Sequence, residues 1–210
     1  MKKKICYVIG AGENYGLDFR PEPDDYVVAA DGGLKYLEEN NIEADLVIGD
    51  FDTLRYTPHH HNVIQLNPQK DETDMFSAIS QGIQLGYKEF RILCGTGGRV
   101  DHSFANIQIL AYLANRQMQG FLIDRNAVLT VIKDSEYTFD SSYTGYVSIF
   151  SISDSCTGVY LENLKYELNN AELVNDFPLG VSNEFIGAEG KIKVENGMLL
   201  IIFPRKELRI

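Results

Sequence analysis

The sequence has no tryptophan, only six prolines, and fewer basic than acidic residues, with 19 Lys and Arg against 30 Asp and Glu. The formal net charge is therefore −11. An acidic chain is a poor candidate for binding nucleic acid through a basic patch. No stretch approaches the roughly 20 consecutive apolar residues that a membrane-spanning helix needs. We therefore expect neither nucleic acid nor a membrane as a partner.

Cysteine is also scarce. Cys6, Cys94 and Cys156 lie far apart and form no Cys-x-x-Cys pair. This pattern argues against a disulfide framework or a zinc site and favours a cytoplasmic location. The N-terminal segment MKKKICYVIGAG begins like a signal peptide, but its apolar run is only about as long as one strand. We interpret it as the first β-strand and keep a signal peptide as the alternative.

The first 125 residues alternate between strand and helix patterns, which is typical of an α/β domain with a mostly parallel, Rossmann-like sheet. Helices are predicted over 71–85 and 103–119 from apolar residues at three- and four-residue spacing. The glycines Gly86 and Gly120 follow them where helix ends are expected. Short β-rich runs predict strands at 5–9, 26–30, 46–48, 63–66, 90–94 and 121–124.

Residues 126–210 have a different texture, because helical periodicity fades and short β-branched and aromatic runs replace it. Runs of this kind occupy 129–132, 146–152 and 159–166. The pair Asn196-Gly197 lies between two apolar runs and predicts a β-hairpin. We therefore expect a domain boundary near residue 125, followed by an antiparallel all-β sandwich domain.

Acidic residues gather just after the predicted strands of the first domain. Because parallel strands end at one edge of a sheet, we expect these carboxylates to lie close together, where open α/β sheets bind ligands. Several carboxylates repel one another unless a cation is present, and their oxygens suit Mg²⁺. The residues concerned are Asp31, Asp50, Asp52, Asp71, Asp74 and Asp101.

Two of the acidic motifs have a specific spacing. In GDFDT, alternation along an extended segment would point Asp50 and Asp52 to one side and Phe51 into the core. A metal clamp and a simple polar turn both remain open. In KDETD, Asp71 could cap a helix and Asp74 could lie in its first turn, where carboxylates are favoured. Capping by one aspartate and metal binding by another are compatible.

The segment GTGGRVDH is the most informative one. Its glycines allow close approach of a ligand, Arg99 offers a fork that matches phosphate oxygens, and a helix follows directly. His102 could cap or orient as readily as take part in chemistry. The segment GAGENYG near the N-terminus only loosely resembles a dinucleotide-binding loop, and we interpret it as a turn. The run 59–61, three histidines, is interpreted as a solvated loop.

Taken together, the motifs ADGG, GDFD, KDETD, GTGGRVDH and GVSNE occur in an order that resembles the thiamine pyrophosphokinase (thiamine diphosphokinase) family. The resemblance spans nearly the whole chain. Thr53 stands where serine is common after GDFD. Since the chain has no Trp, any family contact that stacks tryptophan on the vitamin must be made otherwise.

The resemblance implies an enzyme that moves the terminal diphosphate of ATP to the hydroxyl of thiamine and releases AMP. It implies Mg²⁺ held by Asp50, Asp52 and Asp74, with Asp71 or Asp101 nearby and one aspartate orienting the hydroxyl. Arg99 and Lys70 would contact the phosphates. Residues expected to bind the nucleotide are Asp31, Lys70, Thr73, Gly95, Thr96, Gly97, Gly98 and His102.

The resemblance also implies a homodimer with active sites shared between subunits. Residues 1–125 would bind ATP and Mg²⁺, and residues 126–210 would complete the thiamine pocket through Ser182 and Asn183. Without the resemblance, a turn between strands explains these two residues equally well. Two competing hypotheses stay open. One is a pyrophosphokinase acting on a hydroxymethylpterin, and the other is a non-catalytic sensor of nucleotide or thiamine diphosphate.

Overall fold

The structure is a computed structural model that describes residues 3–51, 56 and 58–206. The contacts within the chain divide it into two compact units. The first holds the described residues up to Ile109 together with Gly120–Arg125, and the second holds Leu110–Gln119 and Asn126–Lys206. Each unit is described separately.

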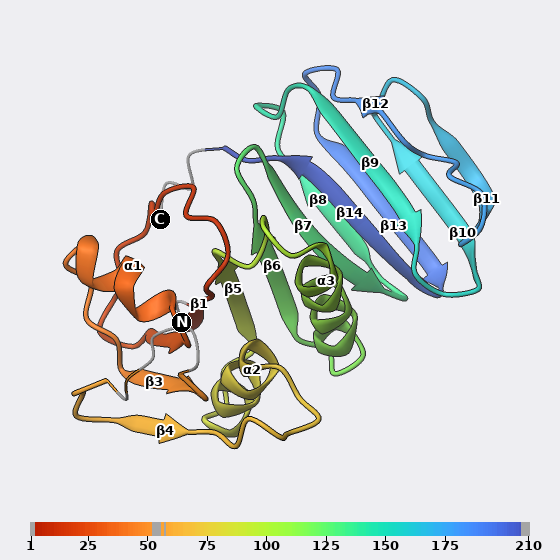
Figure 1. Ribbon diagram of the computed structural model, residues 1–210. Coiled ribbons are helices and arrows are strands. Elements are labelled where there is room, and N and C mark those ends of the chain that lie inside the picture. The colour runs from red at the N-terminus through yellow and green to blue at the C-terminus, as the bar shows by residue number, and fades with distance from the viewer. Residues whose placement is uncertain (1–2, 52–55, 57, 207–210) are drawn as a thin grey trace. The chain divides into compact units, whose positions relative to one another are not determined.

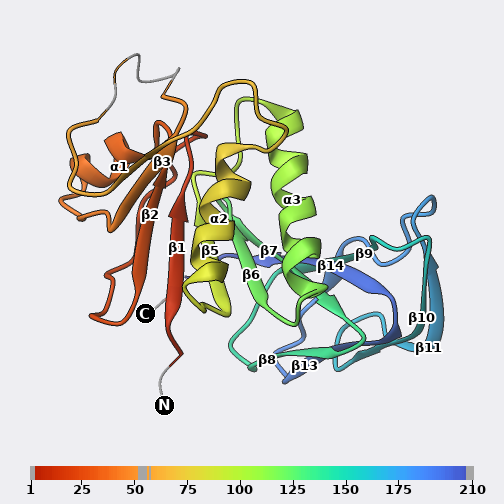
Figure 2. The ribbon, with the colours of Figure 1, turned by 90° about the horizontal axis from the view of Figure 1, so that it is seen from below.

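The first unit is built on strands whose paired neighbours run parallel. In the order β6-β5-β1-β2-β3-β4, the ladders of β1 with β2 and β5, of β2 with β3, and of β3 with β4 are all parallel. Figure 2 shows β1 and β2 side by side. The expected mostly parallel sheet is therefore confirmed. The strands are β1 (Ile5–Ile9), β2 (Tyr26–Ala30), β3 (Leu46–Gly49), β4 (Val63–Gln65), β5 (Glu89–Leu93) and β6 (Gln119–Ile123).

Helices α1 (Gly33–Glu39) and α2 (Asp74–Gln84) cover opposite faces of this sheet. Alternate residues of β1 face opposite sides, so Tyr7 packs into the core on the α1 side while Cys6 faces α2. A Cβ added at Gly82 of α2 would lie 2.7 Å from Cys6 Sγ and from Phe90 Cε1. Only glycine at this position allows α2 to approach the sheet so closely.

The predicted helices exist, but their bounds differ from the predicted ones, and α3 also begins three residues earlier than expected. Helix α2 begins at Asp74, because Thr73 is its N-cap and accepts a hydrogen bond from Phe76 N at 3.2 Å. The expectation that Asp71 caps this helix is therefore wrong. Helix α3 (Val100–Ala114) ends before the predicted residue 119. The chain turns at Gln117, where φ is +57°, and residues 119–123 form β6.

The second unit contains two sets of antiparallel strands from different sheets, in the orders β12-β9-β14-β7 and β11-β10-β13-β8. The predicted antiparallel β structure is confirmed, and Figure 1 shows β9, β14 and β7 in that order. An aromatic cluster joins the two sheets, with Tyr137 and Phe139 of β8 against Phe203 of β14. The strands are β7 (Ala127–Lys133), β8 (Glu136–Phe139), β9 (Tyr146–Ser151), β10 (Ser155–Glu162), β11 (Leu168–Val174), β12 (Asn183–Glu184), β13 (Gly190–Asn196) and β14 (Met198–Pro204).

The hairpin predicted at Asn196-Gly197 is wrong. The turn itself is present, and Gly197 has a φ of +113° that favours glycine. However, β13 pairs with β10 and β8, whereas β14 pairs with β7 and β9. The tight turn therefore carries the chain from one sheet to the other.

Two further features concern the chain as a whole. Cys6, Cys94 and Cys156 are all buried free thiols. Among the described residues, no helix is both long enough and apolar enough to cross a membrane.

Candidate active site

A cavity of about 690 Å³ lies in the first unit, beside the carboxyl ends of its parallel strands. Its walls include Gly10 and Gly12 after β1, Asp31 after β2, Asp50 after β3 and Gly95 after β5. The strand order places β1 between β2 and β5. The chain continues from β1 through β2, β3 and β4 on one side, and β5 lies on the other side of β1. Open α/β sheets bind their ligands at such a switch point.

The backbone turns sharply where three of these strands end. Asp31, Phe51 and Cys94 have φ values of +48°, +61° and +53°, in the region that residues other than glycine rarely adopt. Phe51 is buried in the core as predicted, but the extended conformation expected for GDFDT is wrong at this residue. Asp52 lies outside the described residues. The turns aim Asp31 and Asp50 into the same space.

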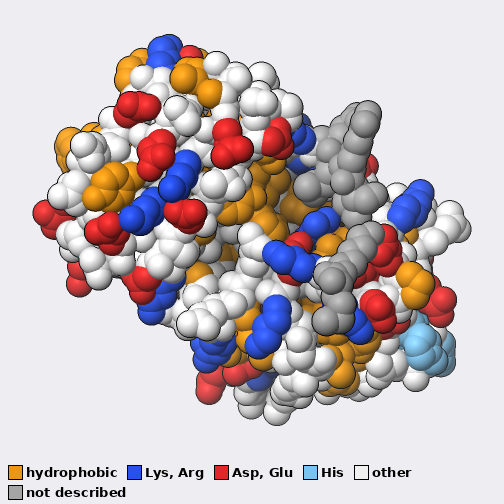
Figure 3. All heavy atoms as spheres, turned by 180° about the vertical axis from the view of Figure 1, so that it is seen from behind, with side chains coloured by type: hydrophobic (Ala, Val, Ile, Leu, Met, Phe, Trp, Pro, Cys, Tyr) orange, Lys and Arg blue, Asp and Glu red, His pale blue; other side chains and the backbone are white. Residues whose placement is uncertain are grey.

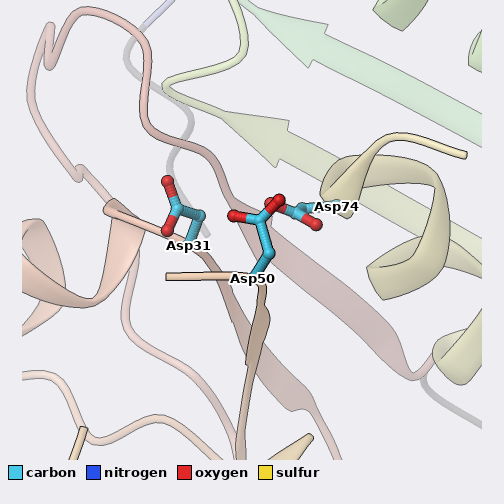
Figure 4. Close-up of side chains that lie close together, drawn as sticks. All are labelled: Asp31, Asp50 and Asp74. Atoms are coloured by element: carbon cyan, nitrogen blue, oxygen red, sulfur yellow. The ribbon is translucent and has the colours of Figure 1, made fainter. Parts of the chain in front are cut away.

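Asp31, Asp50 and Asp74 form a cluster in which one carboxylate oxygen of each lies within 4.8 Å of the others. Figure 4 shows Asp50 between the other two, with the three carboxylates turned toward one another. Asp31 is buried, and the other two are partly buried. A group of carboxylate oxygens at this spacing fits a hard cation such as Mg²⁺. Asp31 was expected to lie near the other carboxylates, and it does, although the family resemblance assigned it to the nucleotide and not to the metal.

Lys70 projects into the same cluster from the segment before α2. Its Nζ lies 2.6 Å from Asp74 Oδ1 and 3.5 Å from Asp50 Oδ2. The side chains of the three residues are only 16–19% exposed. Burial acts to lower the pKa of Lys70, but the hydrogen bonds and negative charges of Asp74 and Asp50 outweigh it and raise that pKa. Lys70 is therefore held in its charged form among the carboxylates.

The loop after β1 is joined by backbone hydrogen bonds to the glycine-rich loop after β5. Gly10 N donates to Leu93 O, Gly12 N to Cys94 O, and Glu13 N to Thr96 O, at 2.9, 2.8 and 2.9 Å. A Cβ on Gly12 would lie 2.4 Å from Thr96 O, so any other residue would push the two loops apart. The segment GAGENYG is therefore more than a turn, since it forms one wall of the cavity.

Side chains from outside the glycine-rich loop hold it in place. Asn106 of α3 is buried and donates from Nδ2 to Gly95 O at 2.6 Å. The hydroxyl of Thr96 donates to Asp124 Oδ1, also at 2.6 Å. Gly97 and Gly98 have φ values of +80° and +63°, which favour glycine. Both glycines line the cavity, so their backbone is available to a ligand.

Arg99 and Asp101 form an ion pair with two hydrogen bonds at the start of α3. Arg99 Nη2 donates to Asp101 Oδ2 at 2.6 Å, and Arg99 Nε donates to Oδ1 at 3.2 Å. These bonds lower the pKa of Asp101 and raise that of Arg99. Arg99 and His102 line the cavity, and His102 N donates to Asp101 Oδ1. Asp101 therefore contacts the residues that line the cavity.

Other predicted residues lie outside the cluster. Asp71 is exposed, and Thr73 lines the cavity while it caps α2.

Histidine side chains are grouped at one place on the surface in Figure 3. In the histidine run, His60 contacts Ala44 O and Asn62 O, both at 3.0 Å. Its two ring nitrogens therefore link backbone segments before β3 and β4.

Ser182 and Asn183 lie in the second unit. Asn183 is buried, and its side chain accepts from Tyr166 N at 2.9 Å and donates to Tyr166 O at 2.7 Å. Ser182 is exposed, has a φ of +59°, and donates its backbone N–H to Ser148 Oγ at 3.0 Å. The side chain of Asn183 thus binds a neighbouring backbone segment within its own unit.

Several residues that line the cavity were not predicted from the sequence. Glu13, Tyr36 and Asn106 are among them. The Tyr36 hydroxyl donates to Gly12 O at 2.9 Å, which fixes the loop after β1. Asn106 lies four residues beyond His102 on α3, so the two residues share one helix face. That spacing is a sequence signal that could have pointed to it.

Comparison with known proteins identifies the relatives of this chain. The family model "Thiamin pyrophosphokinase, catalytic domain" matches residues 22–122, and "Thiamin pyrophosphokinase, vitamin B1 binding domain" matches residues 130–199. A curated relative, the thiamine pyrophosphokinase of Bacillus subtilis (strain 168), is 26% identical over 211 residues, covering 95% of this chain and 98% of the relative.

Solved structures agree with these matches. The Bacillus subtilis thiamine pyrophosphokinase structure has a TM-score of 0.87 at 26% identity, covering 97% of this chain and 100% of the other. That of Geobacillus thermodenitrificans has a TM-score of 0.82 at 28% identity, with 98% and 100% covered. The Candida albicans protein, at 19% identity and a TM-score of 0.79 over 97% and 90%, shares the fold. With both family domains matched in order along its length, this chain belongs to the thiamin pyrophosphokinase family.

Proposed function

We propose that this chain transfers the terminal diphosphate of ATP to the hydroxyl of thiamine, giving thiamine diphosphate and AMP. The observation that carries the proposal is the cluster of Asp31, Asp50 and Asp74, with Lys70 paired to the last two, in the cavity at the strand ends. Phosphoryl transfer asks a protein mainly to position its substrates and to neutralise charge that develops on phosphate oxygens. Carboxylates, a lysine and glycine-rich backbone in one cavity suit that task.

Mg²⁺ fits the donor set of this cluster. Asp50 and Asp74 would hold the ion, Asp31 would lie close enough to join them, and Asp52 stays a proposed ligand. A bound ion would supply positive charge that offsets the charge of the phosphate oxygens. Without a cation, the carboxylates and a triphosphate would repel one another.

The nucleotide would bind against the glycine-rich loop. The order of the parallel strands and the cavity at their ends support a Rossmann-like nucleotide-binding unit. Arg99 and Lys70 would contact the phosphates, and Gly97 and Gly98 would offer backbone N–H groups. Asp31, Thr73, Gly95, Thr96 and His102 complete the proposed nucleotide site. Asp71 or Asp101 remains a candidate for orienting the thiamine hydroxyl.

The second unit would supply the thiamine pocket, and the protein would act as a homodimer in the cytoplasm. Large apolar side chains are exposed next to Ser182 and Asn183, as expected for a surface that another chain covers. They are Tyr146, Tyr166, Val181 and Ile186. Because Asn183 is engaged with Tyr166, Ser182 is the better placed of the two to contact thiamine. The buried free cysteines suit a reducing compartment.

An assay of AMP release tests the function. The protein would be incubated with ATP and Mg²⁺, together with thiamine, a hydroxymethylpterin, or no acceptor. We expect AMP to form with thiamine alone. AMP formation with the pterin would instead support the alternative pyrophosphokinase. Binding of ATP with no AMP under any condition would support a sensor.

Mixing two inactive variants tests the shared site. Asp50→Asn damages the metal cluster, and a large residue at Ser182, as in Ser182→Trp, would block the thiamine side. If subunits share their sites, exchange creates mixed dimers with one intact site, and roughly a quarter of wild-type activity returns. A chain that builds its whole site alone would recover no activity. Sedimentation and a labelled-subunit control must first show dimers that exchange.

A further inference from the structure

The ammonium group of Lys70 occupies space between two carboxylates that the proposed function assigns to a metal ion. It lies 2.6 Å from Asp74 Oδ1 and 3.5 Å from Asp50 Oδ2. Both of these residues also offer an oxygen to the cluster with Asp31. All three side chains of the ion-paired group are more than 80% buried. Lys70 and a divalent cation would therefore compete for the same two carboxylates.

We propose that Lys70 is the internal counter-cation of this site. It neutralises Asp50 and Asp74 in the free chain and gives up these contacts when a divalent ion enters together with a nucleotide. This inference rests on the proposed function for the presence of metal and nucleotide. It adds that the free chain binds the divalent ion weakly by itself.

Electrostatics explains why the ion and the nucleotide would enter together. A divalent ion beside a fixed ammonium is repelled at short range, and this repulsion is strong where water is largely excluded. A triphosphate removes the conflict, because its oxygens offer Lys70 a new partner and also supply ligands to the metal. Each ligand therefore raises the affinity for the other, and such a coupling is reciprocal.

The chemistry of lysine suits this role. Its ammonium is a point charge on a flexible stem of four carbons, so it can turn from a carboxylate to a phosphate without backbone movement. The residues that follow are fixed, since Thr73 caps α2 and Asp74 lies in the first turn of that helix. Asp74 therefore keeps its position while the Lys70 side chain moves.

A simpler role for Lys70 makes a different prediction. If Lys70 only binds phosphate, its removal weakens nucleotide binding and leaves the affinity for a free divalent ion unchanged. If it is the counter-cation, its removal also strengthens binding of the free ion. The affinity for metal in the absence of nucleotide therefore separates the two roles.

The experiment titrates Mn²⁺ into the 210-residue chain without nucleotide and measures free Mn²⁺ by electron paramagnetic resonance. Lys70→Met removes the charge and keeps a similar stem. The matched control is Lys35→Met, which removes the same charge from α1. Lys35 is exposed, and its Nζ lies 3.8 Å from Glu39 Oε1. We expect Lys70→Met to bind Mn²⁺ at least roughly tenfold more tightly than wild type, and Lys35→Met to match wild type.

Equal Mn²⁺ affinity in Lys70→Met and wild type would overturn the inference, as would no detectable binding in either. Circular dichroism checks the fold, and Lys70→Gln serves if Lys70→Met does not fold. Adding Asp50→Asn to Lys70→Met must remove the gain, which places the ion at this cluster. The AMP assay of wild type is read separately. If wild type releases AMP but Lys70→Met binds Mn²⁺ no more tightly than wild type, only the counter-cation proposal is wrong. If Lys70→Met binds Mn²⁺ more tightly but wild type releases no AMP, only the proposed function is wrong.

Discussion

The hydroxyl of Thr96 donates to Asp124 Oδ1 at 2.6 Å, joining the loop after β5 to the residue that follows β6. The carbonyl of Thr96 accepts from Glu13 N at 2.9 Å, so this one residue is held from two sides. The neighbouring glycines have no side chains that could make hydrogen bonds of this kind. The position of the glycine-rich loop therefore depends on contacts made by Thr96.

Replacing Thr96 with valine keeps its shape and removes the donor. Loss of a hydrogen bond to a carboxylate costs roughly 1.5–3 kcal/mol, so the KM for ATP should rise by about tenfold or more. We expect kcat to change less, because the loop positions the nucleotide. Thr96→Ser is the matched control, since it keeps the hydroxyl and should restore a KM near that of wild type. Equal KM values for the valine and serine variants would contradict a positioning role.

The carboxylate cluster gives a second prediction. Asp50→Asn and Asp74→Asn should each lower kcat/KM by about 10²–10³-fold, because each removes charge from the metal site while keeping side-chain shape. Asp31→Asn should have a comparable effect if Asp31 joins the site. EDTA should abolish activity and Mg²⁺ should restore it.

The control for this series is Asp24→Asn, a substitution of the same kind at an exposed residue that pairs with Lys4. It should retain near-wild-type turnover. Full activity in EDTA, or near-normal turnover in the cluster variants, would mean that the acidic residues form only a polar turn.

Asn183 gives a prediction about stability. Its side chain pairs with both backbone groups of Tyr166, and Asn183→Ala leaves those groups without these partners. We expect the free energy of unfolding to fall by about 2–3 kcal/mol in urea titrations. Ser182→Ala at the exposed neighbouring position should cost far less. An unchanged urea midpoint in Asn183→Ala would show that the side chain is free to serve a ligand instead.

The thiol of Cys6 gives a prediction about pH. Burial raises the pKa of Cys6 from 9.0 to about 12, and the negative charge of Asp45 adds to the shift. The folded chain therefore keeps the protonated thiol, while the unfolded chain ionises it above its ordinary pKa. The stability that this thiol contributes is fully present below pH 9.0 and falls as pH rises toward 12.

Cys6→Ala isolates this contribution, because tyrosines and lysines titrate in both proteins. The difference in unfolding free energy between wild type and variant should be constant near pH 7. It should shrink by up to about 1.4 kcal/mol per pH unit above the ordinary thiol pKa. Parallel stability curves across the alkaline range would contradict the buried-thiol account.

The positions of the strands in the first unit could be predicted from the sequence because local signals agreed. Ile5–Ile9 and Tyr26–Ala30 are apolar runs between turn residues, and both match β1 and β2. Helix α1 was missed because seven residues are too few for a clear period. The Asn196-Gly197 turn has the expected local geometry, but the choice of sheet for each strand depends on long-range pairing that local patterns do not contain.

The site was predictable in part for the same reason. Acidic residues after parallel strands were expected to meet at one edge, and Asp31, Asp50 and Asp74 do lie together. The position of Asp31 beside Asp50 and Asp74 depends on β2 lying next to β3 and on the positive φ of Asp31 itself. The ion pairs of Lys70 and the bond between Thr96 and Asp124 depend on side-chain directions, which residue types alone do not set.

Transfer of a labelled phosphate tests the central claim most directly. ATP labelled at its β- or γ-phosphorus would be incubated with the protein, thiamine and Mg²⁺, and the products separated. The account predicts that both labels enter thiamine diphosphate in equal amounts and that unlabelled AMP forms at the same rate. Formation of ADP with only the γ label on thiamine, or no labelled thiamine at all, would contradict transfer of the diphosphate as one unit.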